Sequence, residues 1–204
     1  HDALPIYCMR WIAQAETALD MMVDRSLNRF AHGSLLAEKQ GIQWMIADST
    51  MELYQAKLMV LHAAYRIDNG LEFKSEVSMA KHFVTNMLGR VIDRSIQVHG
   101  ALGYSTDTPL AHMYQHARWA RFADGADEVH QMRIAQRTIA AYRDGGSTRV
   151  ATGDLHAAVI ANDQALEQAL CDAGLATGDL CWPLPFAPEL YRSEFASPIA
   201  DMRN

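Results

Sequence analysis

The sequence has few cysteines, little excess charge and no long apolar run, and each lack excludes a class of protein. Three widely spaced cysteines among 204 residues suit neither a disulfide framework nor a zinc ribbon, so we expect a reducing, cytoplasmic compartment. The net charge of −6, with acids and bases interspersed, gives no basic surface for nucleic acid. There is no apolar run of about 18 residues, the length needed to span a membrane.

Before residue 147 the chain also lacks the alternation of apolar and polar residues that strands show. Apolar residues there recur at steps of three and four, which predicts amphipathic helices over about 8–30, 40–68, 75–98, 109–121 and 127–142. We expect the glycines that follow to end these helices, namely Gly33, Gly70, Gly100 and the pair at 145–146. The composition, 50% apolar and 21% charged, is that of a globular domain. The expected fold is therefore all-α, a bundle of long helices.

The same periodicity predicts which helix faces are buried. The second helix should bury a stripe through Trp44 and Met51, and the third a stripe through Val84 and Ile92. The Thr108-Pro109 pair predicts the N-cap and the first helical residue of the fourth helix.

The two ends of the chain differ from its middle. Residues 1–6, HDALPI, would be encoded by a codon string that resembles a sequencing-adapter tail, so we expect an adapter-derived or disordered segment; a natural extended N-terminus is the alternative. Beyond about residue 147, Asn162 precedes one short helical pattern, and four prolines between 183 and 198 exclude a long helix. The predicted organisation is a segment 1–6, a helical domain 7–146 and an irregular tail 147–204 with one short helix.

One loop carboxylate has no evident structural task. Asp124 lies in RFADGADEVHQ, before the last predicted helix, where Asp127 is placed to cap that helix and His130 follows at its third position. An exposed loop acid is the simplest interpretation of Asp124. Burial beside Phe122 and Gly125 would instead give it the proton affinity that a general base requires.

Three other patterns contain residue types that bind phosphates, adenine or metals. Arg29 and Gln40 lie at the two ends of RFAHGSLLAEKQ. An arginine guanidinium can bind a pyrophosphate through two hydrogen bonds, although a solvated arginine at a helix end is the simpler interpretation. The string IQVHGALGY has two glycines three apart, which would let a bulky ligand approach the backbone or would form only a helix C-cap and a turn. His112 and His116 have metal-ligand spacing, but HMYQH lacks the glutamate of HExxH, and we expect no metal.

In this order and spacing, the motifs resemble the C-terminal helical domain of the acyl-CoA dehydrogenase family. The resemblance covers residues 8–143 and rests on Arg29–Gly33 leading to Gln40, Gln97–Gly103, Pro109, Ala117-Arg118 and Asp124-Gly125. It implies an FAD enzyme that oxidises the Cα–Cβ bond of an acyl-CoA thioester. A carboxylate removes the α-proton, and the β-hydrogen leaves as a hydride to the flavin.

The resemblance implies that Asp124 is the catalytic base, in the place where the family commonly has glutamate, and that Gly125 binds the substrate. FAD would lie across a subunit interface of a homodimer or homotetramer, and electrons would pass to an electron-transfer flavoprotein or a similar acceptor. The residues implied in FAD binding are Arg29, His32, Gln40, Gln97, His99, Gly100, Ala101, Ala126 and Glu128. Other domains of that family supply much of the site, so we expect this chain alone to be inactive.

The tail, from NDQALEQALCDAG onward, resembles part of a leucine-aminopeptidase catalytic domain. None of that family's metal-ligand motifs is found in it, so we assign the tail no metal and no peptidase chemistry. Two alternatives to the dehydrogenase interpretation stay open. The chain would be a non-catalytic helical oligomerisation module, or a chimeric or truncated open reading frame with no function of its own.

Overall fold

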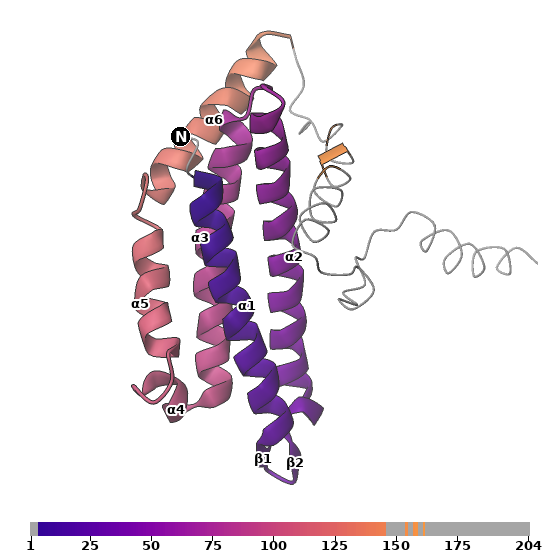
Figure 1. Ribbon diagram of the computed structural model, residues 1–204, viewed down its shortest axis with the longest axis vertical. Helices are drawn as coiled ribbons and strands as arrows, with labels where there is room; N and C mark the ends of the chain where they lie inside the picture. Colours follow the sequence, from indigo (N-terminus) through magenta and orange to yellow (C-terminus); the bar gives the residue numbers. More distant parts are fainter. Residues whose placement is uncertain (1–3, 146–153, 155–156, 159–160, 162–204) are drawn as a thin grey trace, which may run out of the picture. The chain divides into compact units, whose positions relative to one another are not determined.

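The computed structural model describes residues 4–145, 154, 157–158 and 161, and this part is almost entirely helical (Figure 1). The helices are α1 (Leu4–Asn28), α2 (Gln40–Asp68), α3 (Lys74–His99), α4 (Ala101–Tyr104), α5 (Leu110–Ala120) and α6 (Asp127–Arg143). Between α1 and α2 lie the strands β1 (Phe30–Ala31) and β2 (Ser34–Leu35) and the 3-10 helix η1 (Leu36–Glu38). The predicted all-α bundle is confirmed, with a small hairpin and the short helix α4 as additions.

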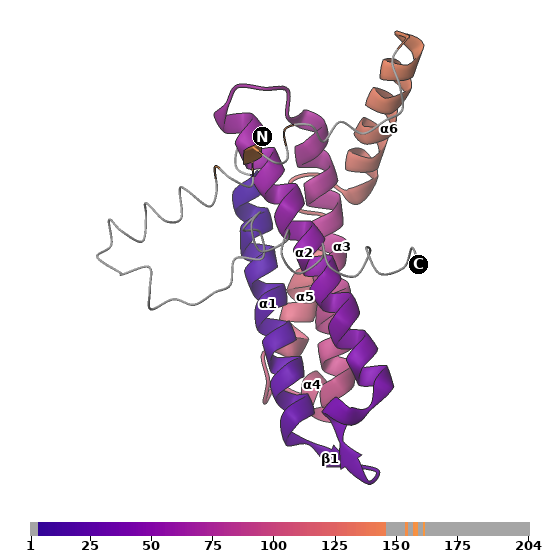
Figure 2. The ribbon, with the colours of Figure 1, turned by 90° about the vertical axis from the view of Figure 1, so that its right-hand side faces the viewer.

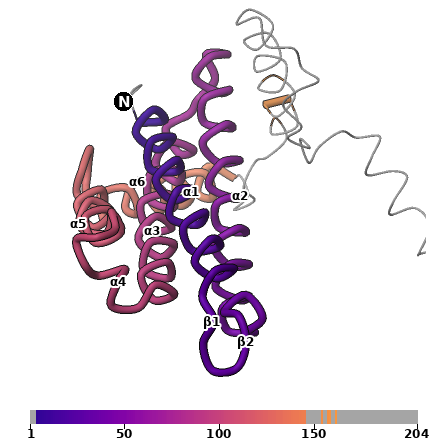
Figure 3. The backbone as a smooth tube through the Cα atoms, turned by 60° about the horizontal axis from the view of Figure 1, so that its bottom comes forward, coloured from indigo at the N-terminus to yellow at the C-terminus, as the bar shows by residue number. Residues whose placement is uncertain are grey.

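Helix α3 is the central element, because it packs against α1, α2, α5 and α6. Figures 2 and 3 show α1, α2 and α3 running side by side, while α6 extends beyond them (Figure 2). The predicted buried face of α3 is confirmed, since Val84, Leu88 and Ile92 are each 0% exposed. They pack with Ile12 of α1 and Leu110 of α5 in one core cluster. Burying a side chain of this size stabilises the fold by about 1.5–3 kcal/mol, so α3 holds the bundle together.

The predicted buried face of α2 is wrong. Trp44 and Met51 are 62% and 54% exposed, whereas Leu53, Ala56 and Val60 are buried. Helix α2 carries two apolar stripes, and periodicity alone does not decide which of them meets α1 and α3. The stripe that contains Trp44 and Met51 therefore stays on the surface of this chain.

The first predicted helix end is also wrong. Helix α1 ends at Asn28, and Gly33 lies in the turn of the β1–β2 hairpin, in which Ala31 pairs with Ser34. His32 and Gly33, the two central residues of this turn, have φ angles of 50° and 84°. Two successive positive φ angles are typical of the type I′ turns that join two strands directly. Gly33 thus serves the hairpin and not the helix.

Two other glycine ends are confirmed, and one predicted cap is not. Gly70 and Gly100, which follow α2 and α3, both have φ angles of 65°, a conformation that glycine adopts without strain. The hydroxyl of Thr108 donates to the carbonyl of Leu102 at 3.3 Å and makes no cap, while Pro109 is the N-cap residue of α5. The loop before α5 is therefore fastened to α4 by a side chain that was expected to begin a helix.

At the N-terminal side, α1 begins inside the segment that was expected to be adapter-derived or disordered. Leu4 is 5% exposed and packs with Ala63 and Val77 in a second apolar cluster. The origin of residues 1–6 stays a prediction.

Cys8 is buried in the main core, and burial raises the pKa of its thiol to about 12.

Beyond α6, Asp154 contacts α2. Its carboxylate lies 2.8 Å from His62 Nε2 and accepts a hydrogen bond from Arg66 at 2.7 Å, so the contacts of the bundle continue past the predicted boundary at about 147. The predicted short helix after Asn162 lies outside the described residues. In the part of the chain that the structure describes, every helix is too short or too polar to cross a membrane.

Candidate active-site loop

The connection between α5 and α6, residues 121–126, carries the predicted base Asp124. Asp124 has a φ angle of 52° and Gly125 one of 109°, so two consecutive residues are left-handed. Aspartate tolerates this region better than most residues. At Gly125, a Cβ atom would lie 3.0 Å from His130 Nε2. The Asp-Gly pair therefore sets the local shape of the loop.

The side chain of Asp124 is exposed, and its carboxylate has no hydrogen-bond or ion-pair partner among the described residues. The burial beside Phe122 that the sequence suggested is absent from this chain. The Phe122 ring is 57% exposed, with the Arg118 guanidinium 4.3 Å from its centroid. A non-glycine residue held at positive φ persists only where its surroundings fix it, and such residues cluster at functional sites. The loop thus presents an exposed carboxylate on a constrained backbone.

Asp127 is not the helix cap that the sequence predicted. Ala126 is the N-cap residue of α6, and Asp127 is its first helical residue, 3% exposed. The carboxylate of Asp127 accepts hydrogen bonds from Arg121 Nε at 2.6 Å and Asn86 Nδ2 at 3.0 Å. Burial alone would raise the pKa of Asp127, but these hydrogen bonds and the positive charge of Lys81 lower it below 3.8. Asp127 is therefore a buried anion that joins α3, α5 and α6.

Lys81, on α3, has a side chain that is 0% exposed. Its Nζ atom donates to the carbonyl of Gly125 at 2.7 Å and to that of Arg121 at 3.2 Å, and it lies 3.6 Å from Asp127 Oδ1. Burial lowers the pKa of Lys81 from 10.5, although the nearby Asp127 opposes this change. A buried ammonium is tolerated only where it is paired and hydrogen-bonded, and here most of its partners are backbone atoms of the loop.

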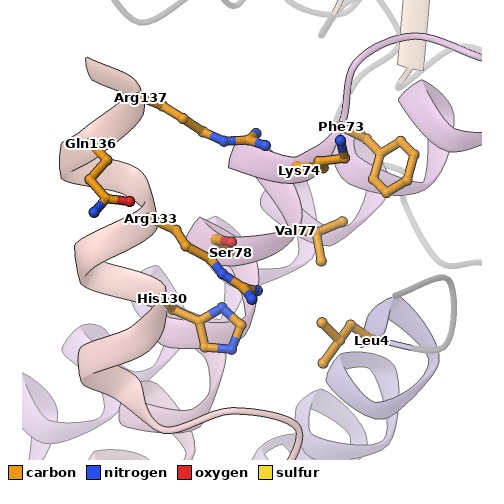
Figure 4. A pocket seen from close by; sticks show the side chains of 9 residues that line it. All are labelled: Leu4, Phe73, Lys74, Val77, Ser78, His130, Arg133, Gln136 and Arg137. Atoms are coloured by element: carbon orange, nitrogen blue, oxygen red, sulfur yellow. The ribbon is translucent and has the colours of Figure 1, made fainter. Parts of the chain in front are cut away.

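His130, in the first turn of α6, lies behind the loop. Its ring is 1% exposed, with Nε2 3.4 Å from the Asp124 carbonyl and Nδ1 without a partner among the described residues. A cavity of about 250 Å³ lies beside this ring and is also lined by Arg133 and Arg137 of the same helix. Figure 4 shows the three side chains. Burial and the charge of Lys81 lower the pKa of His130 below 6.5, so the ring is neutral at about pH 7.

Three of the implied FAD residues lie around the hairpin. Arg29 precedes β1, His32 lies in the turn and Gln40 begins α2. All three side chains are exposed, and those of Arg29 and Gln40 have no hydrogen-bond or ion-pair partner in the described part of the chain. The Nζ atom of Lys39 donates to the His32 carbonyl at 2.9 Å, which fastens the turn to the start of α2. An exposed guanidinium that has no partner in this part of the chain is a group that could bind a pyrophosphate.

Four further implied FAD residues lie at the end of α3 and the start of α4, namely Gln97, His99, Gly100 and Ala101. His99 is only 8% exposed, and its Nδ1 atom lies 2.8 Å from the Ser95 carbonyl of its own helix. The other three are exposed, and the space where Gly100 would carry a Cβ is open. At Gly103, in contrast, a Cβ would lie 2.8 Å from His99 Cβ. This glycine lets α4 pack on α3 and does not open the backbone to a ligand.

The structure brings the implied residues together in two groups. The hairpin and α4 both lie at the lower end of the bundle in Figure 1, whereas the loop between α5 and α6 lies nearer the opposite end. That loop carries Asp124 and Gly125, followed by Ala126, which is half-buried, and Glu128, which is exposed.

The histidines with metal-ligand spacing do not gather other ligands. Among the described residues, no group of three His, Cys, Asp or Glu side chains is placed to hold a metal ion. The His116 ring packs edge-on against Trp119, with ring centroids 5.3 Å apart. Burial and the neighbouring His112 and Arg10 lower the pKa of His116 below 6.5.

Lys81, Asn86 and Arg121 support the loop but were not predicted from the sequence. One signal was available, because Lys81 lies between Val77 and Val84 on the buried face of α3, and a charge at a buried position implies a partner. Asn86 gave no such signal, since its role depends on a contact with Asp127, 41 residues away.

Known proteins match most of the described chain. The profile of the acyl-CoA dehydrogenase C-terminal domain matches residues 5–139. The Mycobacterium tuberculosis protein named "Probable acyl-CoA dehydrogenase FadE2" is 46% identical over 132 residues, 64% of this chain and 32% of that protein. The (R)-benzylsuccinyl-CoA dehydrogenase of Thauera aromatica is 38% identical over 126 residues, 61% of this chain and 31% of its own length. Butyryl-CoA dehydrogenase from Megasphaera elsdenii has a solved structure that superposes with a TM-score of 0.63 at 27% identity, over 65% of this chain and 34% of that one.

The chain thus spans about a third of the length of each of these relatives. A second profile, that of the cytosol aminopeptidase catalytic domain, matches residues 137–204. This smaller match overlaps the first and lies mostly outside the described residues, so the fusion of two families stays a prediction. The first match covers more than half of the chain, and the solved relative shares its helical fold. The chain therefore belongs to the acyl-CoA dehydrogenase family, through the family's C-terminal domain.

Proposed function

We propose that residues 7–146 form the base-carrying, FAD-binding part of a cytoplasmic acyl-CoA dehydrogenase, an oxidoreductase that acts on CH–CH donors. Two relatives are dehydrogenases of acyl-CoA thioesters by name, (R)-benzylsuccinyl-CoA and butyryl-CoA. The observation that carries the proposal is the state of Asp124. Its carboxylate is exposed, lacks a partner among the described residues and is held at a φ angle of 52° on the loop before α6. Such a group is available to a substrate and already fixed in place.

In this function Asp124 takes the α-proton of the thioester. The carboxylate oxygen gains the proton, and the electron pair of the broken Cα–H bond forms the new Cα–Cβ double bond. The N–H group of Gly125, the residue after the base, makes no hydrogen bond with the described residues and would bind the substrate. FAD, when bound, accepts the β-hydrogen as a hydride.

The chain also supplies residues that fit the cofactor. Arg29, His32 and Gln40 would bind the pyrophosphate and adenosine side, and Ala126 with Glu128 the adenine end. Gln97, His99, Gly100 and Ala101 would contact the FAD of the neighbouring subunit in a homodimer or homotetramer, where buried His99 contributes backbone and not its ring. Electrons would leave through an electron-transfer flavoprotein or a similar acceptor.

A domain exchange tests this function. Residues 7–143 replace the matching domain of the T. aromatica (R)-benzylsuccinyl-CoA dehydrogenase, and turnover is followed with a dye acceptor. We expect the exchanged enzyme to bind FAD and to oxidise (R)-benzylsuccinyl-CoA or another acyl-CoA of a chain-length series. A folded, FAD-containing exchange protein that oxidises no acyl-CoA would refute the proposed function. The chain by itself is expected to be inactive.

The alternative of a non-catalytic oligomerisation module has one observation in its favour. Trp44 and Met51 form an exposed apolar stripe on α2, at 62% and 54% exposure, and such a stripe suits contact with another helix. Sedimentation of the chain with and without FAD separates the two functions. A stable oligomer that neither contains nor takes up flavin would favour the module over the dehydrogenase.

A further inference from the structure

A single buried ammonium fastens both ends of the loop that carries Asp124. Lys81 Nζ donates to the carbonyl of Arg121, where the loop begins, and to that of Gly125, directly after Asp124. These two bonds, at 3.2 and 2.7 Å, enclose Phe122, Ala123 and Asp124. Hydrogen bonds from a charged donor are roughly twice as strong as neutral ones. The lysine therefore closes the loop from the inside of the bundle.

Few other bonds hold the second half of this loop. The N–H groups of Phe122 and Ala123 donate to the Trp119 carbonyl at 2.8 and 3.3 Å, which continues the turn of α5. Among the described residues, no such bond is made by the N–H groups of Asp124 and Gly125. The contact between His130 Nε2 and the Asp124 carbonyl is long, at 3.4 Å. The bond from Lys81 Nζ to the Gly125 carbonyl is thus the shortest hydrogen bond that holds Asp124 and Gly125.

The ammonium is itself held in place. Asp127, 3.6 Å from Lys81 Nζ, is fixed by hydrogen bonds from Arg121 and Asn86. Lys81, the loop and the start of α6 therefore form one connected unit on α3. An apolar side chain at a fully buried position would stabilise a helix core at least as well as a paired charge. An apolar side chain could not make the two hydrogen bonds that the Lys81 ammonium donates to backbone carbonyls.

We infer that Lys81 is a positioning residue, which acts through the carbonyls of Arg121 and Gly125 to hold the Asp124 carboxylate where it meets the substrate. This role rests on the proposed function of Asp124 as the base. Lys81 itself is buried and does not touch the substrate. A misplacement of a catalytic group by about 1 Å lowers the rate about 100-fold, so loss of the ammonium should appear in turnover and in loop order.

The first test measures loop order in the full chain. Lys81→Met keeps the apolar stem and removes the ammonium, and Lys74→Met, at an exposed position of the same helix, is the matched control. Backbone ¹⁵N order parameters of Ala123, Asp124 and Gly125 should fall from about 0.85, typical of a rigid backbone, to about 0.6 or below in Lys81→Met only. Unchanged order parameters in a folded Lys81→Met chain would overturn the inference.

The second test separates positioning from general stability in the domain-exchange enzyme. Lys81→Met should lower kcat about 100-fold while KM and FAD content stay within about threefold of the parent. An unchanged kcat would overturn the positioning role even if the loop is mobile. An exchange enzyme that is inactive with Lys81 intact would refute the proposed function, whereas the order parameters would still decide whether Lys81 holds the loop.

If Lys81→Met does not fold, NMR of the unmodified chain tests whether Lys81 holds the loop. The Lys81 ammonium should then give a ¹⁵N signal in slow exchange with water, with through-hydrogen-bond couplings to the carbonyl carbons of Arg121 and Gly125. A rapidly exchanging ammonium without these couplings would contradict the inference.

Discussion

Replacing Asp127 by asparagine removes one charge from the buried network and changes little else. In the folded protein one carboxylate oxygen accepts from Arg121 at 2.6 Å and Asn86 at 3.0 Å, while the other lies 3.6 Å from Lys81 Nζ. The asparagine side chain has the same shape, but one of its two positions is an NH₂ donor. In either orientation this donor faces at least one cation, so Asp127→Asn leaves a buried positive charge without its counterion.

The expected loss follows from how deeply the two cations are buried. Removing one partner of a buried ion pair costs about 3–5 kcal/mol. The Arg121 side chain is 39% exposed and is partly solvated after the change, and Lys81 keeps two carbonyl acceptors. We therefore expect a loss near the lower end, about 3 kcal/mol, from the total of about 5–15 kcal/mol that is usual for a native domain.

Urea unfolding of Asp127→Asn, followed by far-ultraviolet circular dichroism, measures this loss. The midpoint should fall while the m-value stays unchanged, and Asp93→Asn, an exposed change on α3, should stay within about 0.5 kcal/mol of the parent. Because the folded pKa of Asp127 is lowered below 3.8, its contribution is present above that pH and is lost as the pH falls through the folded pKa. A loss of less than about 1 kcal/mol in the free energy of unfolding at neutral pH would refute the account of Asp127 as a buried anion that joins α3, α5 and α6.

Two further predictions concern the same loop. Gly125→Ala should destabilise the fold by about 2 kcal/mol, because φ is 109° and the new Cβ would lie 3.0 Å from His130 Nε2. Gly89→Ala, in open space within α3, is the control and should stabilise the fold by about 0.5–1 kcal/mol in the same urea assay. Equal effects of the two changes would count against a strained loop. The pKa of His130 is lowered in the folded protein, so as the pH falls the unfolded chain binds this proton before the folded chain does. The free energy of unfolding should therefore be highest above pH 6.5 and should decline below it. His130→Gln should reduce this decline in unfolding series between about pH 5.5 and 7.5, and an unchanged slope would contradict the lowered pKa.

Much of the helical architecture was predictable, because long segments repeat apolar residues with one period. Helix α2 was predicted at its observed ends, Gln40 and Asp68, and the buried stripe of α3 through Val84 and Ile92 was identified. The β1–β2 hairpin escaped prediction, since strands of two residues are too short to show alternation. The buried side of α2 depends on which neighbours cover it, and its own two apolar stripes do not reveal that.

The candidate site was predictable only in part. The Asp-Gly pair at 124–125 stands out in the sequence, and the structure shows why the two residues occur together, since both have positive φ angles. Asp127 is a buried counterion and not the predicted helix cap because of its contacts with Lys81 and Asn86, which lie more than 40 residues earlier in the chain. The bonds from Lys81 end on backbone carbonyls, which every residue has, so no side-chain pattern could have indicated them.

The measurement that tests the central claim most directly is the turnover of Asp124 variants in the domain-exchange enzyme. Asp124→Asn should lower kcat by about 10³-fold, within the range expected for loss of a general base, while FAD stays bound. Asp107→Asn, an exposed acid before α5, is the matched control and should leave kcat unchanged. A turnover of Asp124→Asn within about tenfold of the parent would contradict the assignment of Asp124 as the base.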